Sequence, residues 1–283
     1  MCGIFAYIGN NTPWEGMKNE FERIKYRGPD NTRVSTLENN GIFAFHRLAI
    51  MGISKEGNQP MTHPEDDSLT LICNGEIYNY LELAKKYGFQ LQTGSDSEII
   101  LFMFKQFGIK KTIEELDGVF VFVIHDKNKR QFFSARDPFG VRPGFIGYNK
   151  KDVFIASEAK ALTNICETVT PFVPGTWWSS TSPRIFNRYY FYKKERIKDS
   201  KREEMLNTIK YRLTTAVKKR MMAEREVSAL LSGGLDYSLI TALVAKQTNS
   251  EKLKTFSIGI KGSVDLEYTQ LAANYLKTNH FQI

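Results

Sequence analysis

The stretch MCGIFAYI, residues 1–8, decides the fold, because it places a thiol at the second position and follows it with an apolar run. We expect the initiator Met to be removed next to a residue as small as Cys2, so that the mature chain begins with this cysteine. One residue then carries a thiol and a free α-amine, whose ordinary pKa of about 8 lets it take the proton of its own side chain. The apolar run predicts a strand that holds this terminus rigidly. An ordinary buried cysteine is the alternative interpretation of these residues alone.

Length and composition indicate a soluble globular protein. The chain has 283 residues, enough for two domains or one large one, and is 42% hydrophobic and 25% charged. No apolar run reaches the ~18 residues of a membrane span, and no basic segment precedes a long apolar one, so we expect no secretory signal. The three cysteines, Cys2, Cys73 and Cys166, are an odd count for a disulfide framework and lack metal-ligand spacing. We therefore expect a cytoplasmic protein with no metal centre built from its own side chains.

The net charge of +8 is concentrated in one segment. Residues 193–225 hold twelve Lys or Arg and five acidic residues, which accounts for nearly all of the excess. Acidic residues are interspersed in this run, and Leu206, Ile209 and Leu213 trace a helical apolar stripe. Such a pattern is typical of a solvated linker and an amphipathic helix, so nucleic acid is a disfavoured partner.

The first part of the chain has the pattern of antiparallel sheets. Strands are expected at residues 4–8, 42–48, 69–73, 119–124, 131–135, 145–148 and 153–156, and helices at about 15–25, 80–87 and 96–107. Asp96 is the predicted N-cap of the last helix. Many strands with few helices between them favour antiparallel sheets. We predict a domain over residues 1–183 and a linker over 184–202, because the stretch 171–188 is rich in Pro, Ser and Thr.

The pattern changes in residues 203–283. The expected order is helix 203–222, strand 227–231, helix 239–247, strand 254–260, helix 266–277 and a third strand from residue 280. Alternation of strands and helices predicts a parallel α/β domain. The pattern breaks off at Ile283, so we expect either a fragment of a longer protein or a naturally shortened chain.

Two segments downstream of Cys2 suit amide hydrolysis by a thiol. Arg47 lies in HRLAI, residues 46–50, and its guanidinium can grip a substrate carboxylate with two hydrogen bonds. Asn74 and Gly75 follow a predicted strand, where a side-chain amide and a backbone N–H can form an oxyanion hole. The alternative interpretations are a surface charge for Arg47 and a hairpin turn for Asn-Gly.

Two further segments complete this set. Asp96 lies in GSDSE, residues 94–98, at a predicted helix start, where its carboxylate can receive an ammonium group. The segment RGPD, residues 27–30, is expected as a turn near the mouth of such a site. A helix cap and a plain turn are the respective alternatives.

In this order, the segments make the first 180 or so residues resemble the class II, N-terminal-nucleophile (Ntn) glutamine amidotransferase domain. The matching segments are MCGI, RGPD, HRLAI, NGEIYN and GSDSE, followed by RDPFG at 136–140 and ASEAKAL at 156–162. The resemblance implies an α+β domain of the Ntn-hydrolase type, an αββα sandwich of two antiparallel sheets.

The resemblance also implies the chemistry. Cys2 would attack the side-chain amide of glutamine while its α-amine moves the proton, and Asn74 with the Gly75 N–H would stabilise the oxyanion. A thioester would form, ammonia would leave and water would release glutamate. The implied glutamine-binding residues are Arg47 for the α-carboxylate, Leu48, Ala49, Ile50, Met51, Asn74, Gly75, and Glu76 and Asp96 for the α-amino group.

The segment SGGLDYS, residues 232–238, stands between a predicted strand and a predicted helix. Small residues and a helix N-terminus there can present backbone amides to phosphate oxygens, although Gly-rich loops at such positions are frequent. The segment resembles the PP-loop of ATP pyrophosphatases, and Tyr237 departs from that loop, which has Ser at this position.

An amidotransferase segment followed by this loop, with FSIG at 256–259, resembles the glutamine-dependent asparagine synthetases. The resemblance implies that aspartate is activated as β-aspartyl-AMP and attacked by ammonia from the Cys2 site. The implied ATP-binding residues are Leu231 and Ile258 beside the adenine, and Ser232, Gly233, Gly234, Asp236 and Ser238 around the pyrophosphate with Mg²⁺. Asp265 and Glu267 lie near the phosphates in this interpretation, or simply begin a helix.

Members of that family continue for several hundred residues, so the synthetase half is expected to be incomplete here. The implied partners are glutamine, aspartate and ATP. A homodimer is a possible assembly, and no membrane association is expected. A glutaminase-only chain, or an amidotransferase with another acceptor, is the first alternative. A catalytically silent regulatory or interaction protein is an alternative of another class.

Overall fold

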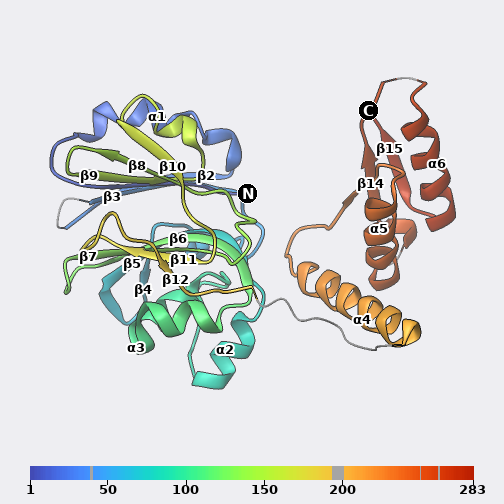
Figure 1. The fold of residues 1–283 in the computed structure, drawn as a ribbon, viewed down its shortest axis with the longest axis horizontal. Helices are drawn as coiled ribbons and strands as arrows, with labels where there is room; N and C mark the ends of the chain where they lie inside the picture. The colour runs from blue at the N-terminus through green and yellow to red at the C-terminus, as the bar shows by residue number, and fades with distance from the viewer. Residues whose placement is uncertain (39–40, 193–200, 249, 261) are drawn as a thin grey trace. The chain divides into compact units, whose positions relative to one another are not determined.

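The structure is a computed structural model that describes residues 1–38, 41–192, 201–248, 250–260 and 262–283 (Figure 1). The chain divides into two compact units, over residues 1–193 and 194–283. None of the described helices combines the length and apolar character needed to cross a bilayer.

Unit 1, residues 1–193, contains two six-stranded sheets in which every neighbouring pair of strands is antiparallel. The first has the order β10 (Thr168–Pro171), β8 (Phe145–Asn149), β9 (Asp152–Ala156), β1 (Gly3–Ile8), β3 (Gly41–Arg47), β2 (Asn31–Leu37). The second has the order β12 (Asn187–Arg188), β11 (Thr176–Ser179), β7 (Gln131–Arg136), β6 (Gly118–Asp126), β5 (Asp66–Ile77), β4 (Met61–His63).

The two sheets lie face to face between helical layers. Helix α1 (Lys18–Glu22) and nearby 3-10 helices cover the outer face of the first sheet, and α2 (Tyr80–Tyr87) and α3 (Glu98–Glu115) cover that of the second (Figure 1). Unit 1 as a whole has four described 3-10 helices: η1 (Trp14–Gly16), η2 (Lys25–Arg27), η3 (Lys55–Gly57) and η4 (Ala159–Ala161). The prediction of an αββα sandwich is confirmed.

Strand β1 is a continuous apolar run because both of its faces are buried. Side chains alternate between the faces of a strand, so Ile4 and Ala6 enter the core between the sheets, while Phe5 and Tyr7 pack under α1. Pairing with β3 and β9 on its two sides holds the strand in the middle of its sheet. The chain terminus that precedes it is therefore attached to a strand that is paired on both sides and buried on both faces.

Three sequence predictions for unit 1 need correction. The helix expected at 15–25 is broken into η1, α1 and η2, which together curve over the sheet. Helix α3 continues beyond residue 107 through a kink at Gly108, whose φ is 71°. Asp96 is not its N-cap: Ser97 holds that position without a side-chain capping bond, and the Asp96 carboxylate accepts a hydrogen bond from the Ile77 N–H at the end of β5.

Unit 2, residues 194–283, has a parallel sheet of order β13 (Ala229–Leu230), β14 (Lys254–Ser257), β15 (Asn279–Gln282). Its helices are α4 (Arg202–Arg220), α5 (Leu235–Gln247) and α6 (Val264–Leu276), with the 3-10 helix η5 (Ser250–Lys252). The predicted order of strands and helices is confirmed, although β13 and β14 are shorter than the strands expected at 227–231 and 254–260.

The stretch expected as a linker, residues 184–202, includes contacts with unit 1. Strand β12 pairs with β11, and the Tyr189 hydroxyl donates to the Arg136 carbonyl at 2.8 Å. Residues 193–200 of that stretch lie outside the described residues.

Candidate active site

Contacts from separate segments fix the start of β1. The Leu48 N–H donates to Cys2 Sγ at 3.4 Å, and the thiol lies 3.5 Å from the Leu48 carbonyl oxygen. Arg27 Nε donates to the carbonyl oxygen of Cys2 at 2.9 Å, and the Ile4 N–H donates to Ser157 Oγ at 3.0 Å. The main chain on both sides of the sulfur is thereby held in place.

The RGPD segment belongs to this support and is more than a turn at the pocket mouth. Arg27 is buried and pairs with Glu158 at 2.6 Å, so the segments RGPD and ASEAKAL meet beside Cys2. Asp30 Oδ2 accepts a hydrogen bond from the Ala49 N–H at 2.8 Å, which fixes the backbone after β3. Ala49 itself does not line the pocket beside Cys2.

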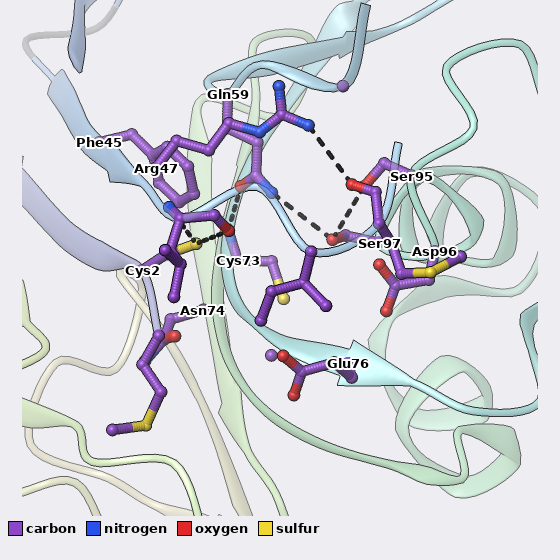
Figure 2. Close-up of a pocket in the computed structure, with 16 residues that line it drawn as sticks. Cys2, Phe45, Arg47, Gln59, Cys73, Asn74, Glu76, Ser95, Asp96 and Ser97 are labelled. Atoms are coloured by element: carbon purple, nitrogen blue, oxygen red, sulfur yellow. Dashed lines mark hydrogen bonds between the residues drawn. The ribbon is translucent and has the colours of Figure 1, made fainter. Parts of the chain in front are cut away.

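A small pocket, with a cavity volume of about 30 Å³ while Met1 is present, lies beside Cys2 (Figure 2). It brings together the two residues before β1, parts of β3 and of the segment that follows it, β5, and the turn before α3, which are far apart in the sequence. The glutamine-binding residues implied by the sequence that line it are Arg47, Leu48, Ile50, Met51, Asn74, Gly75, Glu76 and Asp96.

Arg47 is buried, and its guanidinium is already engaged by the segment that follows it. Nη1 donates to the Ser54 carbonyl at 2.8 Å and to Asn58 Oδ1 at 2.7 Å. Nη2 donates to the Met51 carbonyl at 3.3 Å and also to that of Gly52. A substrate carboxylate that takes two hydrogen bonds from Arg47 must therefore replace some of these carbonyl oxygens.

Asn74 and Gly75 lie inside β5, so the hairpin-turn interpretation of this Asn-Gly pair is wrong. The Asn74 side chain is buried, and its Nδ2 has no hydrogen-bond partner among the described residues. A buried donor without a partner costs roughly 1–3 kcal/mol, which makes it a candidate for binding a ligand. Gly75 allows close packing here, because a Cβ would lie 2.5 Å from the Val119 carbonyl oxygen.

The two carboxylates of the pocket have different surroundings. Asp96 accepts a hydrogen bond from the Ile77 N–H at 2.6 Å, and burial raises the pKa of its carboxyl group to about 6. Glu76 forms an ion pair with Arg142, and both side chains are mostly buried. Since Arg142 neutralises Glu76, Asp96 is the better placed of the two to receive an ammonium group.

Burial also governs the thiol. It raises the pKa of Cys2, while the hydrogen bond with Leu48, the nearby N-terminal amine and Arg47 act in the opposite direction. Met1 lines the pocket, and while it is present the nitrogen of Cys2 is an amide that cannot accept a proton.

Several pocket residues are not singled out by the sequence. Gln59 and Cys73 line the pocket, and so do Ser95 and Ser97 of the GSDSE segment. Gln59 Oε1 accepts a hydrogen bond from the Cys73 N–H at 2.5 Å. A lone Gln in a loop carries no recognisable pattern, because its role depends on which strand lies opposite.

The family model of the glutamine amidotransferase domain matches residues 1–173, more than half of the chain. The chain belongs to the glutamine amidotransferase domain family. Residues 208–283 match the family model of asparagine synthase. The motifs of unit 1 that the sequence suggested are thus those of an established family.

Curated relatives agree with both matches. The glutamine-hydrolyzing asparagine synthetase of Rattus norvegicus is 33% identical, over 100% of this chain and 56% of the relative. Asparagine synthetase B of Escherichia coli K12 is also 33% identical, over 100% of this chain and 54% of the relative. The chain spans about half the length of the curated relatives it matches.

Solved structures share the fold. Glutamine phosphoribosylpyrophosphate amidotransferase from B. subtilis matches with a TM-score of 0.57 and 16% identity, over 99% of this chain and 65% of that one. An allosteric regulatory enzyme of purine biosynthesis matches with a TM-score of 0.58 and 15% identity, over 99% and 80%. At these identities the likeness concerns the fold alone.

The loop between β13 and α5 lies in the region that matches the asparagine synthase family. Gly233 has a φ of 75°, and Gly234 caps α5 while its N–H donates to Ser232 Oγ at 3.4 Å. Asp236 lies in the first turn of α5. The Ser238 hydroxyl is buried and has no partner among the described residues.

A cavity of about 270 Å³ lies beside this loop in the asparagine synthase region. Of the residues that the sequence implies for ATP, Leu231, Ser232 and Ile258 line it, whereas Gly233, Gly234, Asp236 and Ser238 do not. Asp265 lines the cavity and Glu267 does not. Tyr237 lines it as well and is 51% exposed, so the residue that departs from the PP-loop pattern lies at the cavity wall.

Proposed function

We propose that this amidotransferase-family chain hydrolyses glutamine at Cys2 and supplies the ammonia for the synthesis of asparagine from ATP-activated aspartate. The observation that carries the first step is the buried, unpartnered Nδ2 of Asn74 in the pocket that Cys2 lines. A donor held in this way stabilises charge only when a ligand oxygen arrives, which is the property of an oxyanion hole.

The proposed hydrolysis begins with removal of Met1, which frees the α-amine of Cys2 and clears part of the pocket. That amine takes the thiol proton, and the sulfur attacks the amide carbon of glutamine. The carbonyl oxygen becomes an oxyanion bound by Asn74 Nδ2 and the Gly75 N–H. The C–N bond then breaks as the ammonium form of the amine returns its proton to the leaving ammonia. Water attacks the thioester, which releases glutamate and restores the thiol.

Two charged groups orient the substrate in this proposal. Arg47 binds the α-carboxylate by exchanging carbonyl partners of the 51–58 segment for substrate oxygens. Asp96 binds the α-ammonium group, and Glu76 stays paired with Arg142 at the edge of the site. Positive and negative groups therefore face the two ends of a zwitterion, which favours a free amino acid over a peptide.

The second half of the proposal rests on the asparagine synthase match and on the names of the relatives. Leu231 and Ile258 would flank the adenine of ATP, and the loop at 232–238 would receive the phosphates. Mg²⁺ would arrive with ATP and neutralise phosphate charge; Asp236 is a suitable additional ligand, since Mg²⁺ sites often combine one carboxylate with phosphates. Among the described residues, no three His, Cys, Asp or Glu side chains form a metal cluster of their own.

Product analysis tests both halves. Glutamate release from glutamine is measured first, with Cys2→Ala as the inactive control. Aspartate and MgATP are then added, and AMP, pyrophosphate and asparagine are followed. Glutamate without AMP supports a glutaminase-only chain, an alternative that Tyr237 at the cavity wall favours. Equal glutamate release by Cys2→Ala and the parent would leave a catalytically silent protein as the better interpretation.

A further inference from the structure

Strand β5 has an open edge at the pocket. Three of its residues, Cys73, Gly75 and Ile77, direct their N–H groups away from β6, because backbone groups alternate between the two sides of a strand. The first donates to Gln59 Oε1 at 2.5 Å, and the third donates to Asp96 Oδ2 at 2.6 Å. The middle one, on Gly75, faces the pocket between two side chains that both line it.

Gln59 takes the place of a strand partner. Strand β4 pairs with β5 with Met61 opposite Leu71, so the residue two positions earlier stands opposite Cys73. That residue is Gln59, and its side chain, instead of its backbone, makes the next bond of the ladder. Its Nε2 also lies 3.5 Å from Ser97 Oγ, in the turn that carries Asp96. The ladder therefore continues for one step and then leaves Gly75 open.

We propose that Gln59 is a positioning residue of the oxyanion hole, which holds the edge of β5 so that the Gly75 N–H points at the carbonyl oxygen of the substrate. This inference rests on the proposed hydrolysis of glutamine. Without an acceptor from Gln59, the Cys73 N–H is left buried and unpaired, and the strand edge shifts to find a new partner. An oxyanion donor works only within a few tenths of an ångström, about 2.7–3.1 Å from the oxygen, so a small shift weakens it.

The chemistry of glutamine suits this position. Gln59 is 5% exposed, and its side chain is neutral. It therefore satisfies a buried N–H without placing a negative charge beside a developing oxyanion. A carboxylate there would oppose the charge that forms on the substrate. Asn would keep the amide but is one methylene shorter than the bond requires.

The experiment compares Gln59→Met with the parent protein, and with Gln131→Met at the start of β7 as a matched substitution outside the pocket. Gln59→Met should lower kcat for glutamine about 10- to 100-fold, a fraction of what loss of a whole donor costs, and change KM less than about threefold. The affinity for glutamate γ-semialdehyde, which forms a tetrahedral adduct with the thiol, should fall by the same factor as kcat. The affinity for the product glutamate should not change.

Each result decides the question. A Gln59→Met protein whose kcat and aldehyde affinity stay within twofold of the parent overturns the inference. An equal loss of aldehyde and glutamate affinity also overturns it, because it would mean that the whole pocket has collapsed. If Gln59→Met does not fold, Gln59→Asn replaces it, with an expected loss of about fivefold. A parent that releases no glutamate, and binds the aldehyde no better than glutamate, overturns the proposed function and the inference with it.

Discussion

The two units of the chain support their candidate binding segments in opposite ways. In unit 1, the Asn74-Gly75 pair lies within a twelve-residue strand, and the N–H groups on both sides of the Gly75 N–H are bonded to Gln59 and Asp96. In unit 2, the loop at 231–234 follows a strand of two residues and leads into α5, whose first residue, Leu235, is 80% exposed. The pocket beside Cys2 is therefore built on a long, well-paired strand, whereas the loop before α5 depends on few neighbours.

The apolar core of unit 1 is also more extensive than the one described for unit 2. Unit 1 has three clusters of buried apolar residues, one between its sheets and one under each helical layer. The cluster described for unit 2 consists of Val217, Val244, Ala245 and Leu253, and helix α4 leaves Leu206 and Ile209 more than half exposed. Because buried apolar area is the main stabilising term, unit 1 can hold strained or unpaired groups at lower risk to its fold.

The largest expected effect tests whether the unpaired amide of unit 1 serves catalysis. Asn74→Ala should lower kcat for glutamate release about 10²- to 10³-fold while KM changes little, because the lost hydrogen bond is made mainly in the transition state. Steady-state kinetics at saturating glutamine measure this.

Asn79→Ala is the matched control for the Asn74 substitution. Asn79 belongs to the same segment, but its amide donates to the Glu115 carbonyl and accepts from the Asp117 N–H, so its role is structural. It should lower the Tm and preserve kcat. If Asn74→Ala keeps kcat within threefold of the parent, the unpaired amide has no part in the reaction.

The second effect compares Gly75, inside β5, with Gly234, in the loop before α5. Gly75→Ala should destabilise unit 1 by about 1–3 kcal/mol, because the new methyl group meets the Val119 carbonyl oxygen at 2.5 Å. Gly234→Ala places its methyl group 3.5 Å from Ser232 Oγ and should cost only about 0.5 kcal/mol through the weaker helix cap. Urea unfolding checks both by circular dichroism, and tryptophan fluorescence reports unit 1 alone, since Trp14, Trp177 and Trp178 all belong to it. Equal free-energy costs at the two glycines would contradict the contrast between the two segments.

The sequence predicts much of unit 1 because the features that identify it are local. Alternating apolar runs reveal the strands, and Cys2, Arg47 and Asp96 stand in short segments that can be recognised without knowing their neighbours. What it misses depends on register. Gln59 matters only because it stands opposite Cys73 when Met61 pairs with Leu71, a relation that no local pattern contains.

The alternative interpretation of Asn74-Gly75 as a turn and the prediction of Asp96 as a helix cap fail for a similar reason. Both are strong local signals for punctuation between elements. The long pairing of β5 with β6 overrides the first, and the Ile77 N–H captures the carboxylate in the second. Tertiary partners decide in each case, and they come from residues more than fifteen positions away.

The third effect uses the titration of Asp96. Burial raises the pKa of this carboxyl group to about 6, so the free enzyme loses its ammonium-binding charge as the pH falls through that value. We expect kcat/KM for glutamine to fall tenfold for each pH unit below about 6, and Asp96→Asn to raise KM and remove this dependence. The stability effect has the opposite sign: the fold holds the proton more tightly than the unfolded chain does, so ionisation of Asp96 lowers stability as the pH rises from about 4 to 6. A pH profile of kcat/KM that stays flat from 5 to 7 would contradict the assignment.

The smallest effect on the fold is expected at Tyr237. A substitution there should change a property of unit 2 and leave unit 1 unaffected. Its ring is about half exposed in the first turn of α5, so Tyr237→Ser should change the free energy of unfolding by less than about 0.5 kcal/mol and leave glutamate release unchanged. The same ring lines the cavity beside Ser232, so its removal should open the phosphate end and tighten MgATP binding about three- to tenfold, equivalent to about 1 kcal/mol. Calorimetric titration with MgATP measures this, and Tyr275→Ser, at an exposed position of α6 that does not line the cavity, is the matched control. Unchanged MgATP affinity in Tyr237→Ser would mean that the ring does not obstruct the loop, and the weak support of the loop by its short strand would then be the feature that distinguishes unit 2 from unit 1.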